Sequence, residues 1–297
     1  MNYLRHTGVR RCCVALAALS VMGAHAAEWN VQAGLTQRHD NNLNNSTFDS
    51  DIARDKALNF FASTATLWPF ESGGDLGFRG AWSAEAYDRY EGMDHYALTG
   101  ELSGRRKWGL GPFAPWTRVA WSATRLNFAN SIRNGWLRQL TFSTGKRLTE
   151  EWSLYADYRW ERRTAHDLAQ RIAGVSGDVF SQRGRNLNVG VEYAWSNSGW
   201  LDATYLLRDG DLVASTRIHR GSTIRAVSTA IAGDPVFGSD FIAYKLSGKT
   251  QGLSLAARYV PARDWQLSLS LQHWRTHGAG NNDYKRTQTT VGLQHDF

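Results

Sequence analysis

Charged side chains that recur on one parity of alternating segments are the feature of this sequence with the clearest chemical potential. From Leu76 to Tyr87, apolar side chains dominate the even positions, whereas Arg79 and Glu85 occupy odd ones. Alternation with a period of two residues is typical of a strand that turns its polar side chains to one face. When each alternating segment is assigned a polar side in this way, the polar sides together predict one shared face. It includes Arg79, Glu85, Arg105, Arg118, Asp157, Arg159 and Arg208.

Arginine outnumbers acid on this polar face, and the excess leaves two interpretations open. Guanidinium groups form paired hydrogen bonds with carboxylates, so the face can be a lattice of ion pairs that satisfies itself. The same groups can instead bind anionic solutes, including acidic oligosaccharides, if the face lines a pore. Neither interpretation is excluded by the residue types alone.

The elements that position these side chains are short alternating segments. They begin near residues 28, 57, 76, 95, 115, 135, 152, 187, 201, 240, 265 and 284. The 13 Trp, 11 Tyr and 12 Phe, against 5 Pro, favour strands over helices. The phase of alternation is ambiguous in residues 57–70 and changes in residues 248–252, so we expect a β-bulge in each of these two segments.

The connections between the segments alternate in length. Short turns are expected near residues 72, 110, 150, 197 and 262, and longer loops at 40–56, 128–134, 164–182, 212–239 and 276–283. An even number of strands with alternating short and long connections is typical of an up-and-down β-barrel in a membrane. Its lumen-facing polar residues explain the low mean hydropathy of −0.45.

The first 27 residues have the features of a cleaved secretory signal peptide. Three arginines precede an apolar run from Cys12 to Met22, and Ala24-His25-Ala26 follows as a small-x-small cleavage site. Cleavage removes both cysteines and three positive charges, which lowers the formal net charge from +7 to +4. We therefore expect residues 28–297 to form one thiol-free β-barrel domain.

The last segment, Tyr284 to Phe297, reads YKRTQTTVGLQHDF and ends on an aromatic residue. It resembles the closing strand of Gram-negative outer-membrane β-barrels, which the barrel-assembly machinery reads as a signal. Gly292, His295 and Phe297 fall where that signal carries glycine, an aromatic and the final aromatic; His295 replaces the usual Tyr or Phe. The resemblance implies an all-β, transmembrane, antiparallel up-and-down barrel of about 12 strands in the bacterial outer membrane, with both termini periplasmic.

Tryptophan residues gather at the short-turn ends of the expected strands, all on the outward parity. In a membrane barrel, outward aromatic residues at one level form a girdle at the membrane interface. The expected girdle consists of Trp68, Trp108, Trp152, Trp195 and Trp265.

Three phrases give a second, more specific resemblance. They are NNLNNS early in the chain, RLTEEWSLYADYRWERR in the middle and DYKRTQTTVGLQHDF at the end. Together they are similar to the barrel domain of the surface lipoprotein assembly modifier family. That resemblance implies a translocator role in the export of surface lipoproteins or polymers. The family's usual periplasmic tetratricopeptide domain and additional strands have no counterpart in this sequence.

The first long loop contains a distant match to a calcium-binding loop. Asp40, Asn42, Asn44 and Asp51 have oxygen ligands at suitable spacing, although Asn45 replaces the expected glycine and the last ligand is Asp rather than Glu. Asp and Asn are also common in ordinary surface loops. We expect no other metal site and no cofactor.

Catalytic residues are not assembled in any recognisable pattern. His273 points outward near the long-loop end, with Lys and Thr as expected neighbours, and His166 and Asp167 lie in a loop without a nucleophile. An outer-leaflet lipid-modifying hydrolase is therefore the least supported function. Nor does any basic-aromatic pattern indicate nucleic-acid binding.

The favoured function is a narrow outer-membrane pore whose arginine-rich lumen favours anionic solutes or acidic oligosaccharides. A translocator barrel is the first alternative, and a structural envelope protein is the second. We expect a monomer that contacts the barrel-assembly machinery, membrane lipid and lipopolysaccharide. A basic loop could contact lipopolysaccharide phosphates or be solvated; it contains Arg217, His219, Arg220 and Arg225.

Overall fold

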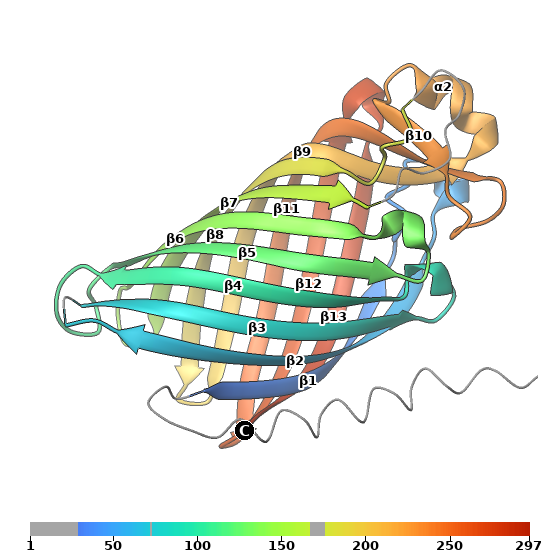
Figure 1. Cartoon of the computed structure of the whole chain (residues 1–297). Helices are drawn as coiled ribbons and strands as arrows, with labels where there is room; N and C mark the ends of the chain where they lie inside the picture. Colours follow the sequence, from blue (N-terminus) through green and yellow to red (C-terminus); the bar gives the residue numbers. More distant parts are fainter. Residues whose placement is uncertain (1–28, 72, 167–175) are drawn as a thin grey trace, which may run out of the picture.

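Twelve antiparallel strands form a closed barrel, which confirms the expected fold class (Figure 1). The computed structural model describes residues 29–71, 73–166 and 176–297. The expected signal peptide and Asp167 therefore lie outside the described residues. Within the described ranges, no helix is long and apolar enough to cross a membrane.

Each barrel strand pairs with its neighbours in the chain, and the last barrel strand returns to the first. The barrel strands are β1 (Asn30–Asp40), β2 (Asp55–Pro69), β3 (Gly74–Tyr87), β4 (His95–Lys107), β5 (Trp116–Phe128), β6 (Gly135–Arg147), β7 (Trp152–Ala165), β8 (Gln182–Ser196), β9 (Gly199–Arg217), β11 (Phe241–Ala262), β12 (Trp265–Gly278) and β13 (Tyr284–Asp296).

Short and long connections alternate around the barrel, so it has a short-turn end and a long-loop end. The longest described connection, between β9 and β11, contains the small elements α2 and β10 at the long-loop end (Figure 1). The remaining elements are all short: η2 (Asp49–Asp51), η3 (Glu91–Met93), η4 (Ser131–Arg133), η5 (Ile218–Arg220), α2 (Gly221–Arg225), β10 (Ala230–Gly233) and η6 (Ala279–Asn281).

Closure occurs between β1 and β13. Their register covers nine residue pairs, from Gln32–Asp296 to Asp40–Gln288, the shortest interface around the barrel. Backbone hydrogen bonds extend it at both ends, from Phe297 N to Val31 O at 2.9 Å and from Asn41 N to Thr287 O at 3.2 Å. The barrel wall is therefore continuous at this seam.

Large apolar side chains cover the outside of the barrel. Leu98, Val119 and Leu269 are examples, each with 45–59% of its surface exposed. Soluble proteins rarely expose a continuous apolar surface of this extent, whereas a bilayer covers it. The five predicted girdle tryptophans are all exposed and lie at the short-turn end, as expected from their parity.

The two expected bulges are absent. β2 pairs with β1 and β3 without a register shift, and β11 pairs with β9 without a shift from Phe241 to Tyr259. The only shift in β11 lies between Tyr259 and Ala262, against β12. The phase of alternation changes in residues 248–252 for another reason. β9 and β11 continue beyond their neighbours at the long-loop end, where the inward side chains of Ile242 and Tyr244 are apolar and buried in a core formed with the loops.

Candidate functional site

The inward faces of the strands form the candidate functional site. Pairing registers place all seven predicted lumen residues on the parity opposite the exposed apolar side chains. For example, Arg105 pairs directly with Arg118, and Arg79 lies opposite Glu101. The shared polar face predicted from parity is therefore the wall of one lumen.

Part of the lumen is an ion-pair lattice. Several of its pairs reach over an intervening strand: Arg208 on β9 binds Glu161 on β7 at 2.9 Å, above Gly184 of β8. A Cβ on Gly184 would lie 3.0 Å from each partner, so the missing side chain leaves room for the pair. The five lumen pairs are Arg38–Glu85, Arg118–Glu101, Arg208–Glu161, Arg258–Glu192 and Arg286–Asp40.

The lattice leaves arginines without acidic partners. Among the described residues, no carboxylate lies within 4.0 Å of the guanidinium groups of Arg79, Arg105, Arg159 or Arg163. Arg105 instead stacks over Trp116 at 5.4 Å, and the Nε of Arg159 is buried without a hydrogen-bond partner. Asp157 and Asp202 are inward acids outside the pairs, and Asp202 accepts hydrogen bonds from Tyr155 and Thr204. Among the described residues, the lattice therefore leaves these four arginines without an ion pair.

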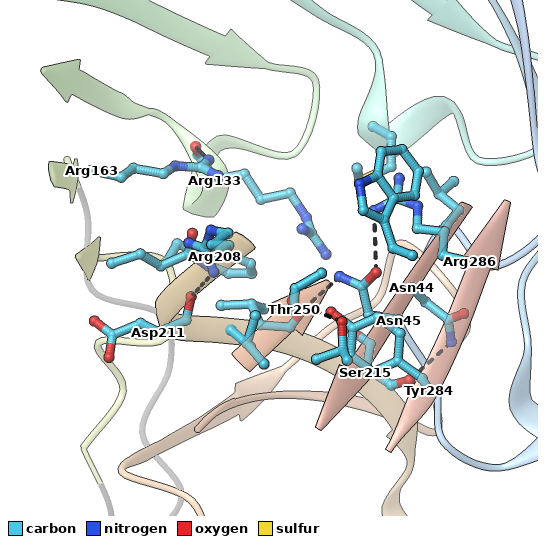
Figure 2. Close-up of a pocket in the computed structure, with 18 of the residues that line it drawn as sticks. Asn44, Asn45, Arg133, Arg163, Arg208, Asp211, Ser215, Thr250, Tyr284 and Arg286 are labelled. Atoms are coloured by element: carbon cyan, nitrogen blue, oxygen red, sulfur yellow. Dashed lines mark hydrogen bonds between the residues drawn. The ribbon is translucent and has the colours of Figure 1, made fainter. Parts of the chain in front are cut away.

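An arginine-lined cavity of about 380 Å³ occupies the long-loop end of the lumen. Figure 2 shows Arg133, Arg163 and Arg208 together on one side of this cavity and Arg286 on the other. Arg163 donates to the backbone oxygen of Arg133 at 2.7 Å rather than to an acid. Guanidinium groups from η4, β7, β9 and β13 thus converge on this cavity, and Arg163 is the one of the four without a carboxylate within 4.0 Å in the described structure.

A second basic cavity lies at the short-turn end. It has a volume of about 490 Å³, and its cationic lining consists of Arg105, Lys107, Arg118, Lys146 and Arg147. The acids on its wall are Asp157 and Glu192. The linings of both cavities thus contain more basic than acidic side chains.

Glycines on the inward face keep aromatic rings close to the wall. Each of these glycines is directly paired with an aromatic residue on the next strand, and an added Cβ would lie 2.3–2.7 Å from the ring. A ring packed over a glycine lies along the sheet and covers its backbone. The four pairs are Phe61 with Gly34, Trp116 with Gly145, Tyr155 with Gly190, and Trp274 with Gly252.

Loops from separate parts of the chain meet over the long-loop end. Loop residue Asn44 exchanges hydrogen bonds with Ser215 on the free edge of β9, at 2.9 Å in each direction. From another loop, Arg133 binds Asp234 at 2.6 and 2.8 Å, and Ser215 donates to the same carboxylate. These contacts form a loop cap, which we define as residues 41–54, 129–134 and 218–240.

Asp51 anchors the first loop of the cap. It is buried, and it accepts hydrogen bonds from the Thr216 hydroxyl, the Arg217 backbone and the Ser50 hydroxyl. Burial raises the pKa of Asp51, but these hydrogen bonds and the charge of Arg217 outweigh it and hold the pKa below its ordinary value. The ionised carboxylate therefore stabilises the cap.

The four residues of the suggested calcium loop hold the loop cap instead. Asp40 accepts from Arg286, Gln288 and the Asn42 backbone, and Asn44 bonds the backbone of Asp51, Ala53 and Ser215. Their oxygens face protein donors rather than one shared point. Within the described ranges, no group of three or more His, Cys, Asp or Glu residues is arranged to hold a metal. Calcium binding by these four residues stays a hypothesis, and in this structure protein donors occupy their oxygens.

In the described contacts, no serine or cysteine lies beside His273 or His166, the two histidines considered for catalysis; the contact of a further histidine, His277, involves an acid. His273 Nδ1 lies 2.9 Å from the Thr287 hydroxyl on the outer face, and His277 pairs with Asp283 at 2.9 Å. His166 is exposed. The Thr287 contact agrees with the neighbour expected from strand pairing.

Two of the three assembly-signal residues, His295 and Phe297, lie on the outer face at the short-turn end. The His295 ring lies 4.5 Å from the Phe297 ring and 4.6 Å from the Trp265 ring, measured between centroids. Gly292 faces the lumen, and an added Cβ there would lie 2.6 Å from the Ser268 hydroxyl. Recognition of this strand by the assembly machinery stays a prediction.

Comparison with solved structures identifies the fold. An outer-membrane channel from Pseudomonas putida F1 is 12% identical over 92% of this chain and 97% of that chain, with a TM-score of 0.54. The chain has the fold of an outer-membrane β-barrel. The KdgM porin in complex with disordered oligogalacturonate is 11% identical over 89% and 99% of the two chains, with a TM-score of 0.42. The Salmonella typhi outer membrane phospholipase is 10% identical over 89% of this chain and 90% of that chain, with a TM-score of 0.45.

These similarities show the fold and not the function. An identity of 12% shows the fold alone, and function depends on the residues placed on that fold. A scan against protein-family models and a search of curated protein sequences find no match.

Proposed function

We propose that the protein is an outer-membrane pore that favours anionic solutes, with acidic oligosaccharides as the preferred class. The observation that carries the proposal is the set of four lumen arginines without a carboxylate within 4.0 Å in the described structure. An unpaired guanidinium in a confined lumen attracts anions more strongly than a paired one, because no protein charge neutralises it. The basic cavities at the two ends extend this attraction along the lumen axis.

The flattened aromatic rings support passage through the lumen. Tyr155 and Trp274 lie over glycines and so do not project from the wall as they would beside a side chain. Rings at the wall are also suitable stacking surfaces for the apolar faces of sugars, while arginine forks bind their carboxylates. This pairing of chemistries is the reason to prefer acidic sugars over simple anions.

The structural-barrel and translocator alternatives are less well supported. A purely structural barrel predicts complete ion pairing inside, whereas Arg79, Arg105 and Arg159 are left over. A translocator predicts a weak seam between the first and last strands. The β1–β13 register is short, but hydrogen bonds extend it at both ends and the Arg286–Asp40 pair lies across it.

Swelling of proteoliposomes tests the proposed solute class. The purified protein is refolded into phosphatidylcholine vesicles, and swelling is compared for an unsaturated uronic acid disaccharide and a neutral disaccharide of similar size. We expect faster entry of the acidic sugar, and we expect R105Q/R159Q to reduce this preference.

The matched control is R106Q/R263Q, which removes two positive charges from exposed residues at the short-turn end, outside the lumen parity. It should keep the preference for the acidic sugar. Equal entry of both sugars into vesicles containing correctly folded wild-type protein would contradict the proposed selectivity.

A further inference from the structure

A row of arginines lies on the outer face of the barrel near the long-loop end. Register pairs Arg138 on β6 with Arg162 on β7, and Arg162 with Arg183 on β8. All three side chains are exposed and have the parity of the lipid-facing residues. Like charges directly opposite one another on adjacent strands are destabilising unless an anion lies between them. The row therefore has the arrangement of an anion-binding site.

The protein itself does not neutralise this row. In the described ranges, no carboxylate lies within 4.0 Å of the guanidinium groups of Arg138, Arg162 or Arg183. The nearest acidic contacts involve other groups: Asp209 lies 3.7 Å from Arg185, and Asp211 accepts from the Arg183 backbone at 2.8 Å. The three guanidinium groups remain available to an external ligand.

An open cavity of about 880 Å³ adjoins the row. It lies at the long-loop end of β8, where that strand begins, and where β9 and β11 extend further than β8. Its lining includes Trp160, Arg162, Arg183, Arg185 and Lys245. The Lys245 ammonium donates to the backbone oxygen of Ser181 at 3.0 Å. Asp178, Asp209 and Asp211 also line the cavity; Asp209 lies 3.7 Å from Arg185 and Asp178 lies 3.9 Å from Lys245. These pairs leave Arg162 and Arg183 without an acidic partner within 4.0 Å in the described structure, and two such arginines beside a tryptophan suit a phosphorylated sugar headgroup rather than an acyl chain.

The level of the row in the membrane indicates the source of the phosphate. Two outward tryptophans flank the row. On β7, Trp160 lies next to Arg162 on the side of the barrel centre, and on β6, Trp136 lies next to Arg138 on the side of the long loops. The Arg125 guanidinium stacks on the Trp136 ring at 5.7 Å. Exposed tryptophans and arginines at one level mark the membrane interface, where lipid headgroups lie. A lipid phosphate is held at that level by its acyl chains, whereas a free phosphate is not.

We infer that Arg138, Arg162 and Arg183, with the cavity beside Trp160, bind the phosphate and sugar headgroup of a phosphorylated outer-leaflet glycolipid such as lipid A. The inference rests on the proposed membrane orientation but not on conduction through the lumen. The lipid would neutralise the arginine row and cover the gap at the end of β8. The site faces away from the lumen, so its loss and the loss of the pore are separable.

Native mass spectrometry of the refolded protein in detergent tests this site. Wild-type protein is mixed with diphosphoryl lipid A, or with lipid A from which both phosphates have been removed, and bound lipid per barrel is measured. We expect at least tenfold stronger retention of the phosphorylated lipid. R162S/R183S should lose most of that retention while keeping the heat-modifiable mobility of a folded barrel and an unchanged conductance.

R106S/R263S is the charge-matched control and should bind lipid A as the wild-type protein does. Equal retention of both lipids by the wild-type protein, or full retention by R162S/R183S, would overturn the inference. Displacement of lipid A by millimolar inorganic phosphate would overturn the lipid assignment and identify a site for free phosphate. A non-conducting barrel that still binds lipid A would contradict the pore and leave this inference intact.

Discussion

The loop cap depends on one buried ion pair, and its removal gives a measurable prediction. The Asp234 side chain is fully buried, and the Arg133 side chain is 9% exposed. Asp234 accepts two hydrogen bonds from Arg133, at 2.6 and 2.8 Å, and one from Ser215 at 2.5 Å. The substitution Asp234→Asn removes the charge but keeps the shape, so it leaves the Arg133 charge buried without a counter-ion.

The size of the effect follows from that burial. Breaking a buried ion pair by removing one partner costs about 3–5 kcal/mol. Because each 1.36 kcal/mol is a factor of ten, the open population of the cap should rise by about 10²–10⁴. The barrel should stay folded, because its strands are held by separate backbone ladders and the two residues lie in loops.

Limited trypsin digestion measures this opening. The refolded protein is digested in detergent, and cleavage after Arg225 is followed by mass spectrometry. When opening and closing are fast relative to cleavage, the cleavage rate follows the open population. We expect D234N to be cleaved at least about 100-fold faster than the wild-type protein.

The control is D209N, which removes an acid from an exposed pair with Arg185 at 3.7 Å. Exposed pairs of this kind contribute little, so its cleavage rate should stay close to that of the wild-type protein. A change of less than about threefold in D234N would refute the claim that the buried pair holds the cap closed.

Three further predictions test separate parts of the structure. Gly190→Val should reduce single-channel conductance, because an added Cβ would lie 2.3 Å from the Tyr155 ring and displace it into the lumen; Gly100→Val, where a Cβ meets nothing within 4 Å, should not. Acid should loosen residues 41–54. Because folding lowers the pKa of Asp51, its carboxylate stabilises the folded loop at any pH above the pKa of the unfolded chain, and this stabilisation is lost as pH falls below about 4. The hydrogen-exchange protection factors of residues 41–54 should therefore fall in the wild-type protein, and those of D51N, already lowered, should show little further change. Phe297→Ala should lower the amount of folded protein in cells but not the yield of refolding in detergent, and equal losses in both would argue against an assembly signal.

Strand parity was predictable because lipid and lumen impose opposite requirements on successive residues. Arg79 and Glu85 could be assigned to the lumen because the opposite register would place both in lipid. The same argument located the girdle, since Trp152 and Trp265 begin strands on the outward parity. The parity argument failed in β11. At the long-loop end the inward side chains of Ile242 and Tyr244 pack in a loop core, so an apolar residue there does not indicate a lipid-facing position.

Contacts between distant residues were not predictable from parity. The Arg38–Glu85 pair reaches over β2, and its existence depends on the stagger between strands rather than on either local pattern. Arg133 and Asp234 are 101 positions apart and lie in loops without periodicity. The pairing of Tyr155 with Gly190 was also missed, although an inward glycine opposite an inward aromatic residue would have been visible once the register was known.

The most direct test of the proposed function is the reversal potential of the refolded protein in a planar bilayer with a salt gradient. For an anion-conducting lumen we expect discrete conductance steps with an anion-selective reversal potential, which is shifted toward zero in R79Q/R105Q/R159Q and unchanged in R106Q/R263Q. A cation-selective potential, or silence from a correctly folded and inserted barrel, would contradict the anion-conducting lumen.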